Sequence, residues 1–177
     1  PKGEFTADVT LPLDIVGTLD YRLITVDGGG NQVSLDGTPV VVFDNIPPEF
    51  QTILVPDSVL IKVPIRVDLM VTDNMGITSV KVIYTDIFGN EKINYLGEDG
   101  PNIYSGLIVE QPGKGTVLIQ FEAMDIFSNK ALSEIFEVSV IDDVPPEAVI
   151  ESPENGSVHG DLVLFEVNVT DEVGETV

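Results

Sequence analysis

The feature that most constrains this chain is an internal repeat. When the sequence is shifted by 98 residues, residues 17–79 align with residues 115–177 without a gap. Identical short motifs recur at this spacing in separate stretches: Pro-Pro-Glu at 47–49 and 145–147, and Val-Thr-Asp at 71–73 and 169–171. A unit of about 98 residues is too long for a helical solenoid repeat, and it fits one small β-sandwich domain.

Local residue patterns also predict β-structure. Apolar residues alternate with other residues at Ile65, Val67, Leu69 and Val71, as in a strand with one buried face. In the second copy Val163, Phe165, Val167 and Val169 are expected to point inward in the same way. Further strands are predicted at 50–55, 77–85, 91–96, 103–110, 116–124 and 133–141. No stretch keeps helical spacing over three turns, so we expect an all-β chain built of seven-stranded sandwiches.

The Pro-Pro boundaries divide the chain into three parts. Residues 47–144 form one complete domain. Residues 1–46 correspond to the last three strands (E, F and G) of a preceding repeat, and residues 145–177 correspond to the first two strands (A and B) of a following one. The linkers around the two Pro-Pro pairs are short and stiffened by proline, so we expect a semi-rigid rod.

Composition excludes several classes of function. Thirty acidic residues against eight lysines and arginines give a net charge of −22, which repels nucleic acid. The chain has no cysteine and one histidine, His159, so it lacks the residues for thiolate zinc sites and for common nucleophilic catalysis. No apolar run approaches the length of a membrane span. We therefore expect a protein that is not an enzyme, binds no nucleic acid and does not insert directly into a membrane.

The motifs resemble the tandem immunoglobulin-like or fibronectin type III-like repeats of bacterial and archaeal surface and secreted proteins. The resemblance is carried by the Pro-Pro-Glu opening, by Val-Thr-Asp-x-x-Gly at 71–76 and 169–174, and by the turn at 123–130. That turn has Ser128 where the first copy has Gly30. The resemblance implies an immunoglobulin-like sandwich and is almost silent on the binding partner, because such folds host many functions.

Two functions fit this resemblance. One is a structural or adhesive segment of an extracellular cell-surface protein, such as a surface layer, stalk, adhesin or filament. The alternative is an accessory, non-catalytic region of a large secreted hydrolase, with polysaccharide binding if aromatic residues lie in an exposed row; the aromatic candidates are Tyr84, Phe88, Tyr95 and Tyr104. The sequons at Asn155 and Asn168 add slight support for an extracellular location.

Oxygen-bearing side chains predict calcium at the two domain junctions. In an immunoglobulin-like sandwich the incoming linker meets the B–C and F–G loops at one pole. At the first junction the candidate ligands are Asp44, Asn45, Glu49, Asp73, Asn74, Asp125 and Asn129. At the second junction they are Asp142, Asp143, Glu147, Asp171 and Glu172. Hard oxygen ligands suit calcium; the competing interpretation is that these residues make turns and keep the rod in solution.

The partners expected from this organisation are neighbouring domains or other copies of the same protein. The apolar strand faces of the two incomplete flanks need a cover. Three arrangements remain open: head-to-tail strand complementation between copies, a longer array of which this chain is a processed or excised piece, and a divergent self-contained fold.

Overall fold

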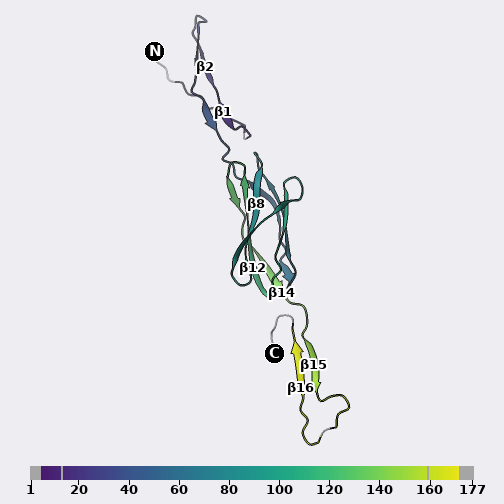
Figure 1. The fold of residues 1–177 in the computed structure, drawn as a ribbon. Coiled ribbons are helices and arrows are strands. Elements are labelled where there is room, and N and C mark those ends of the chain that lie inside the picture. The colour runs from purple at the N-terminus through teal and green to yellow at the C-terminus, as the bar shows by residue number, and fades with distance from the viewer. Residues whose placement is uncertain (1–4, 13, 159, 172–177) are drawn as a thin grey trace.

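The computed structural model describes residues 5–12, 14–158 and 160–171; His159, Glu172 and Gly174 lie outside them. The described residues form sixteen β-strands, which confirms the all-β class. Figure 1 shows an elongated molecule with a central body and hairpins extending from its opposite ends. No helix within these residues is long and apolar enough to cross a membrane.

The central body consists of two sheets packed face to face, an arrangement consistent with a β-sandwich. One sheet has the order β10-β11-β7-β5, formed by Gly97–Glu98, Ile103–Ile108, Ile65–Thr72 and Glu49–Leu54. The other has the order β6-β14-β12-β8-β9, formed by Ser58–Leu60, Phe136–Ile141, Gly115–Asp125, Ile77–Thr85 and Glu91–Tyr95, with β13 (Lys130–Leu132) paired to β12. All pairings are antiparallel except that of β6 with β14.

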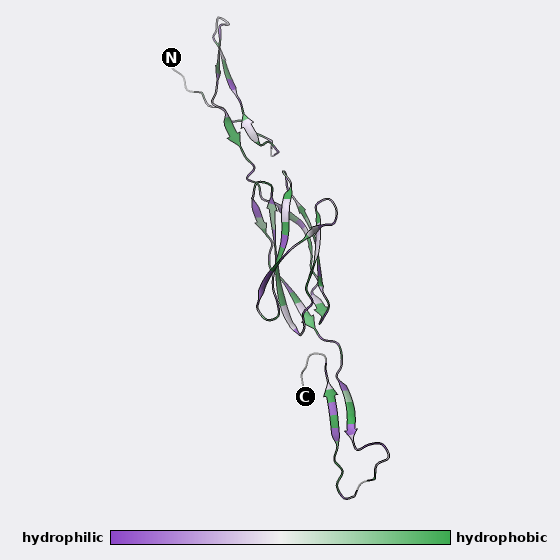
Figure 2. Ribbon diagram, viewed as in Figure 1, coloured by the Kyte–Doolittle hydropathy of each residue, from purple (hydrophilic) through white to green (hydrophobic). Residues whose placement is uncertain are grey.

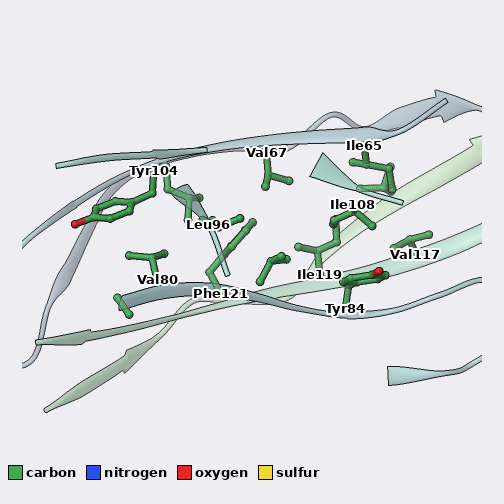
Figure 3. Packing of buried hydrophobic residues seen from close by; sticks show 14 of the residues in the cluster. Ile65, Val67, Val80, Tyr84, Leu96, Tyr104, Ile108, Val117, Ile119 and Phe121 are labelled. Atoms are coloured by element: carbon green, nitrogen blue, oxygen red, sulfur yellow. The ribbon is translucent and has the colours of Figure 1, made fainter. Parts of the chain in front are cut away.

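The core lies between the inner faces of these two sheets. In β7, and in β12 from Val117 onward, every second residue is buried, as the alternating sequence pattern predicts. Phe121 is fully buried, and its ring centroid lies 6.1 Å from that of Phe136. Figure 3 shows side chains from both sheets, including Val67, Ile108 and Ile119, filling the space between them.

The flanks form paired strands of their own. At the N-terminal side β1 (Gly17–Leu19) pairs with β4 (Val40–Val42), and β2 (Arg22–Val26) pairs with β3 (Gln32–Asp36). At the C-terminal side β15 (Glu147–Ser152) pairs with β16 (Glu166–Thr170). Several cross-strand pairs match pairs of the central body: Gly17–Val42 and Gly115–Val140, Thr25–Val33 and Ala123–Ala131, Glu147–Thr170 and Glu49–Thr72.

The expected inward positions of the second flank are not buried. Phe165 is 73% exposed and Val167 is 52% exposed, and β16 begins only at Glu166. The reason is that, within the described part of the chain, this hairpin has no second sheet packed against it. Figure 2 shows apolar segments alternating with polar ones along β15 and β16. Alternation therefore identified strand positions at Val167 and Val169 and was wrong for Val163 and Phe165, which precede the strand; burial of the face requires a further layer.

The aromatic candidates do not form one exposed row. Tyr84 and Tyr104 are buried in the core, at 2% and 9% exposure. Phe88 and Tyr95 are exposed, the first in the turn between β8 and β9 and the second at the end of β9. The aromatic row on which the polysaccharide-binding alternative depended is therefore not assembled by these four residues.

Candidate functional site

Three turns of the chain share one hydrogen-bonded plan. In each, an Asp carboxylate accepts hydrogen bonds from the backbone N–H groups two and four residues later and from the side-chain amide of an Asn. The three turns span Asp27 to Asn31, Asp86 to Asn90 and Asp125 to Asn129. The residue before the Asn is left-handed in all three, with φ of 83° at Gly30, 84° at Gly89 and 70° at Ser128. The serine therefore keeps the turn type of the glycines.

The third of these turns contributes a carboxylate to the first domain junction. Asp125 ends β12 and is 1% exposed. Asp73 follows β7, and its Oδ1 accepts hydrogen bonds from the backbone N–H groups of Met75 at 2.8 Å and Gly76 at 2.9 Å. These local bonds fix both carboxylates beside the incoming linker, to which the neighbouring Asn74 and Asn129 are hydrogen-bonded through Asp44.

The linker contributes the third carboxylate. Asp44 is 8% exposed, and its Oδ1 accepts hydrogen bonds from the Ile46 backbone N–H and from Asn74 Nδ2, both at 3.1 Å. One carboxylate oxygen each of Asp44, Asp73 and Asp125 lies within 4.8 Å of the others. We call these three residues the carboxylate trio. It joins the linker, the β7–β8 loop and the β12–β13 turn.

Two oxygens of the trio are buried without a hydrogen-bond donor, Oδ2 of Asp44 and Oδ2 of Asp73. An unpaired carboxylate oxygen is costly to bury. Calcium binds oxygen at about 2.3–2.6 Å, so two ligands on opposite sides of one ion lie about 5 Å apart. The spacing, the oxygen chemistry and the unsatisfied atoms all fit a divalent cation bound among the three carboxylates.

The charge state of Asp44 supports the same interpretation. Burial raises the pKa of Asp44, but hydrogen bonds from Asn74 and the Ile46 backbone outweigh it, so that its pKa lies below the ordinary value. The carboxylate is therefore ionised at neutral pH and available to a cation.

The turn at Asp86, at the opposite pole of the body, has the same hydrogen-bond pattern, but its carboxylate is paired with a lysine. Asp86 is 5% exposed, and Lys92 Nζ lies 3.1 Å from its Oδ2. Backbone hydrogen bonding from Asn90, followed by the lysine and the other donors, lowers the pKa of Asp86 to about 2 despite its burial. Among the described residues, no lysine or arginine forms an ion pair with a member of the trio. The trio thus lacks the countercharge that Asp86 has.

The other candidate ligands of the first junction lie around the trio. Asn74 and Asn129 contact Asp44 through their amide nitrogens. Asn45 and Glu49 are exposed, and Glu49 Oε2 accepts a hydrogen bond from Gln51 at 2.8 Å. The structure therefore gathers three acids and two amides of the seven predicted residues at one point.

The second junction repeats part of this geometry. Asp142 Oδ1 accepts a hydrogen bond from the Val144 backbone N–H at 3.1 Å, as Asp44 does from Ile46. Glu147 and Asp171 line one shallow hollow beside the linker, and Asp143 is exposed. Glu172 lies outside the described residues. No described residue corresponds to Asp125 at this junction.

The sequence interpretation missed the donor role of Asn129 and the matching turn at Asp86. A signal for both was present, since Asp-Ile-Phe-Gly-Asn at 86–90 recurs as Asp-Ile-Phe-Ser-Asn at 125–129. Comparison of these two turns separates the hydrogen bonds that form the turn itself from those that are made only at the domain junction.

Comparisons with known proteins give matches among solved structures. No protein-family model matches the chain, and no curated protein matches its sequence. The structure is similar to the crystal structure of a tetra-tandem repeat in the extending region of a large adhesion protein, at 15% sequence identity and a TM-score of 0.46. The match covers 79% of this chain and 36% of that one, so the chain spans about a third of its length.

Proposed function

We propose that this chain is a non-catalytic structural or adhesive segment of an extracellular cell-surface protein. In this proposal immunoglobulin-like repeats of about 98 residues form a semi-rigid rod with calcium bound at the domain junctions. The observation that carries it is the carboxylate trio, which lies where the linker enters the central body.

A rod is supported by the path of the chain. The hairpins of the two flanks leave the central body at opposite ends (Figure 1). The first linker is attached to the body by side-chain bonds from Asn74 and Asn129 to Asp44, and Pro48 is buried beside it. A linker with fixed hydrogen bonds and a proline-restricted backbone limits bending between neighbouring domains. The partners implied are the adjacent repeats of the same protein, which would cover the exposed apolar residues of the flanks.

Calcium is the cation that fits the donor set best. Asp44, Asp73 and Asp125 would hold it through carboxylate oxygens. Bound there, the ion supplies positive charge to a buried acidic cluster and links the linker to two loops of the body. Binding to the folded state alone stabilises that state, by about 2.7 kcal/mol at a calcium concentration 100 times the dissociation constant.

The test is calorimetric and thermal titration of the 177-residue chain with calcium. We expect heat of binding and, for a unit of about 100 residues, a rise in Tm of about 10–20 °C near saturation. Asp73→Asn keeps an acceptor for Met75 and Gly76 but removes the charge, and should abolish most of the binding. Asp27→Asn is the control, because Asp27 is exposed away from the trio and its Oδ1 likewise accepts hydrogen bonds from two backbone N–H groups, those of Gly29 and Asn31. Absence of heat and of any Tm change at millimolar calcium would contradict the calcium site.

A further inference from the structure

We propose that Asn129 is a positioning residue of the first domain junction. Its side chain docks the linker on the β12–β13 turn and so pre-forms the cation site. The inference rests on the proposed function and assigns one of the predicted ligands a different role. In the structure the atom of Asn129 that faces the linker is the amide nitrogen, which donates hydrogen bonds and does not bind cations.

The hydrogen bonds of Asn129 Nδ2 account for both of its protons. One bond goes to Asp125 Oδ2 at 2.7 Å. The other proton is directed to two linker carbonyl oxygens, Asp44 O at 3.3 Å and Ile46 O at 3.5 Å. A single amide therefore connects one carboxylate of the trio to the backbone that carries another. Because these contacts need no ion, they hold Asp44 near Asp125 before a cation arrives.

The two equivalent turns show that the turn forms without a contact to a linker. Asn31 Nδ2 and Asn90 Nδ2 bond to Asp27 and Asp86 in the same way, at 2.8 Å and 3.2 Å. Both of these asparagines are exposed, whereas Asn129 is half-buried. Of the three, Asn129 is the one that also bonds to a linker. Loss of the Asn side chain should thus weaken every turn alike, but should undock a linker only at position 129.

Pre-formation has a measurable effect on affinity. If the linker is undocked, Asp44 must be ordered at the moment of binding, and the cost appears as weaker binding. Groups that orient metal ligands without touching the metal typically change affinity by about 10-fold to 100-fold. We expect a loss of this size for Asn129→Ala and less than about a twofold change for Asn90→Ala.

The experiment compares the whole chain with Asn129→Ala, Asn129→Asp and Asn90→Ala. Calcium affinity is measured by calorimetry, and amide hydrogen exchange of the linker is measured in excess chelator. We expect the Ile46 amide to be protected in the wild type and in Asn90→Ala, and to exchange faster in both variants at position 129. Asn129→Asp separates the two roles, because a carboxylate is a better calcium ligand but has no proton to donate.

The outcomes distinguish this inference from the proposed function. Wild-type affinity in Asn129→Ala, or tighter binding with unchanged linker exchange in Asn129→Asp, would overturn the positioning role while leaving the calcium site intact. If the wild type binds no calcium, the calcium part of the proposed function fails. The exchange measurement then still decides whether Asn129 docks the linker, since it is made without the ion.

Discussion

Replacing Ser128 by glycine is expected to stabilise the chain. Ser128 has φ of 70°, a left-handed conformation that costs a residue with a Cβ atom roughly 1–2 kcal/mol. Glycine removes this cost but gains freedom in the unfolded chain, which offsets about 0.5–1 kcal/mol. The net gain lies between about 0 and 1.5 kcal/mol, and its midpoint of about 0.75 kcal/mol corresponds to roughly 3–6 °C in Tm for a unit of about 100 residues.

The reverse substitution, Gly89→Ser, provides the matched test. Gly89 has φ of 84° in the equivalent turn, and a Cβ atom there would meet nothing within 4 Å. The cost of Gly89→Ser should therefore come from the backbone conformation alone. It should lower the unfolding free energy by about as much as Ser128→Gly raises it. Urea unfolding followed by circular dichroism measures both changes, with the double variant expected near the wild type because the turns lie at opposite poles. Two changes of the same sign would refute the argument.

Three further predictions concern the central body. Phe121→Ala empties a fully buried position beside Phe136 and should lower the unfolding free energy by about 3–5 kcal/mol in urea; a loss below about 1 kcal/mol would contradict the packing. Because folding lowers the pKa of Asp86 to about 2, the stabilising effect of its ionised carboxylate is complete above about pH 5 and is lost as the pH falls towards 2. Asp86→Asn should therefore flatten the acid limb of a curve of unfolding free energy against pH. An unchanged slope would exclude Asp86 as the origin of that limb. Glu122 pairs with two lysines at 3.0 and 3.2 Å, so Glu122→Gln should cost about 1 kcal/mol at low salt and less at 1 M salt, as thermal melts at both concentrations would show.

The strands with a clear local pattern were predictable from sequence. In β7 the alternation of Ile65, Val67 and Leu69 with polar residues sets the buried face, since neighbouring side chains of a strand point to opposite sides. The strands β6, β10 and β13 were missed because two or three residues carry no periodicity. Their existence depends on partners distant in the chain, such as the pairing of Val59 with Val140.

The location of the candidate cation site was predictable from the sequence. The arrangement of its oxygen atoms was less predictable. Spacing and loop order placed the acidic residues of the first junction at one pole, where the structure also has them. Which oxygens converge depends on the linker path, which the contacts of Asp44 with Asn74 and Asn129 determine. The exposure of Val167 in β16 shows the same limit, because an alternating pattern identifies a face without identifying what covers it.

The parallel pairing of β6 with β14 determines how the central body would respond to tension. The chain enters at one end of the body and leaves at the other (Figure 1), so a pull along the long axis of the body would draw β6 and β14 in opposite directions along their length. Their hydrogen bonds, including Ser139 N to Asp57 O at 2.9 Å and Ile61 N to Ile141 O at 3.0 Å, lie across that direction and must break together in shear. Forced unfolding is governed by the unfolding rate. We therefore expect resistance to pulling to depend mainly on this three-residue strand, whereas the large core between the sheets contributes most of the equilibrium stability.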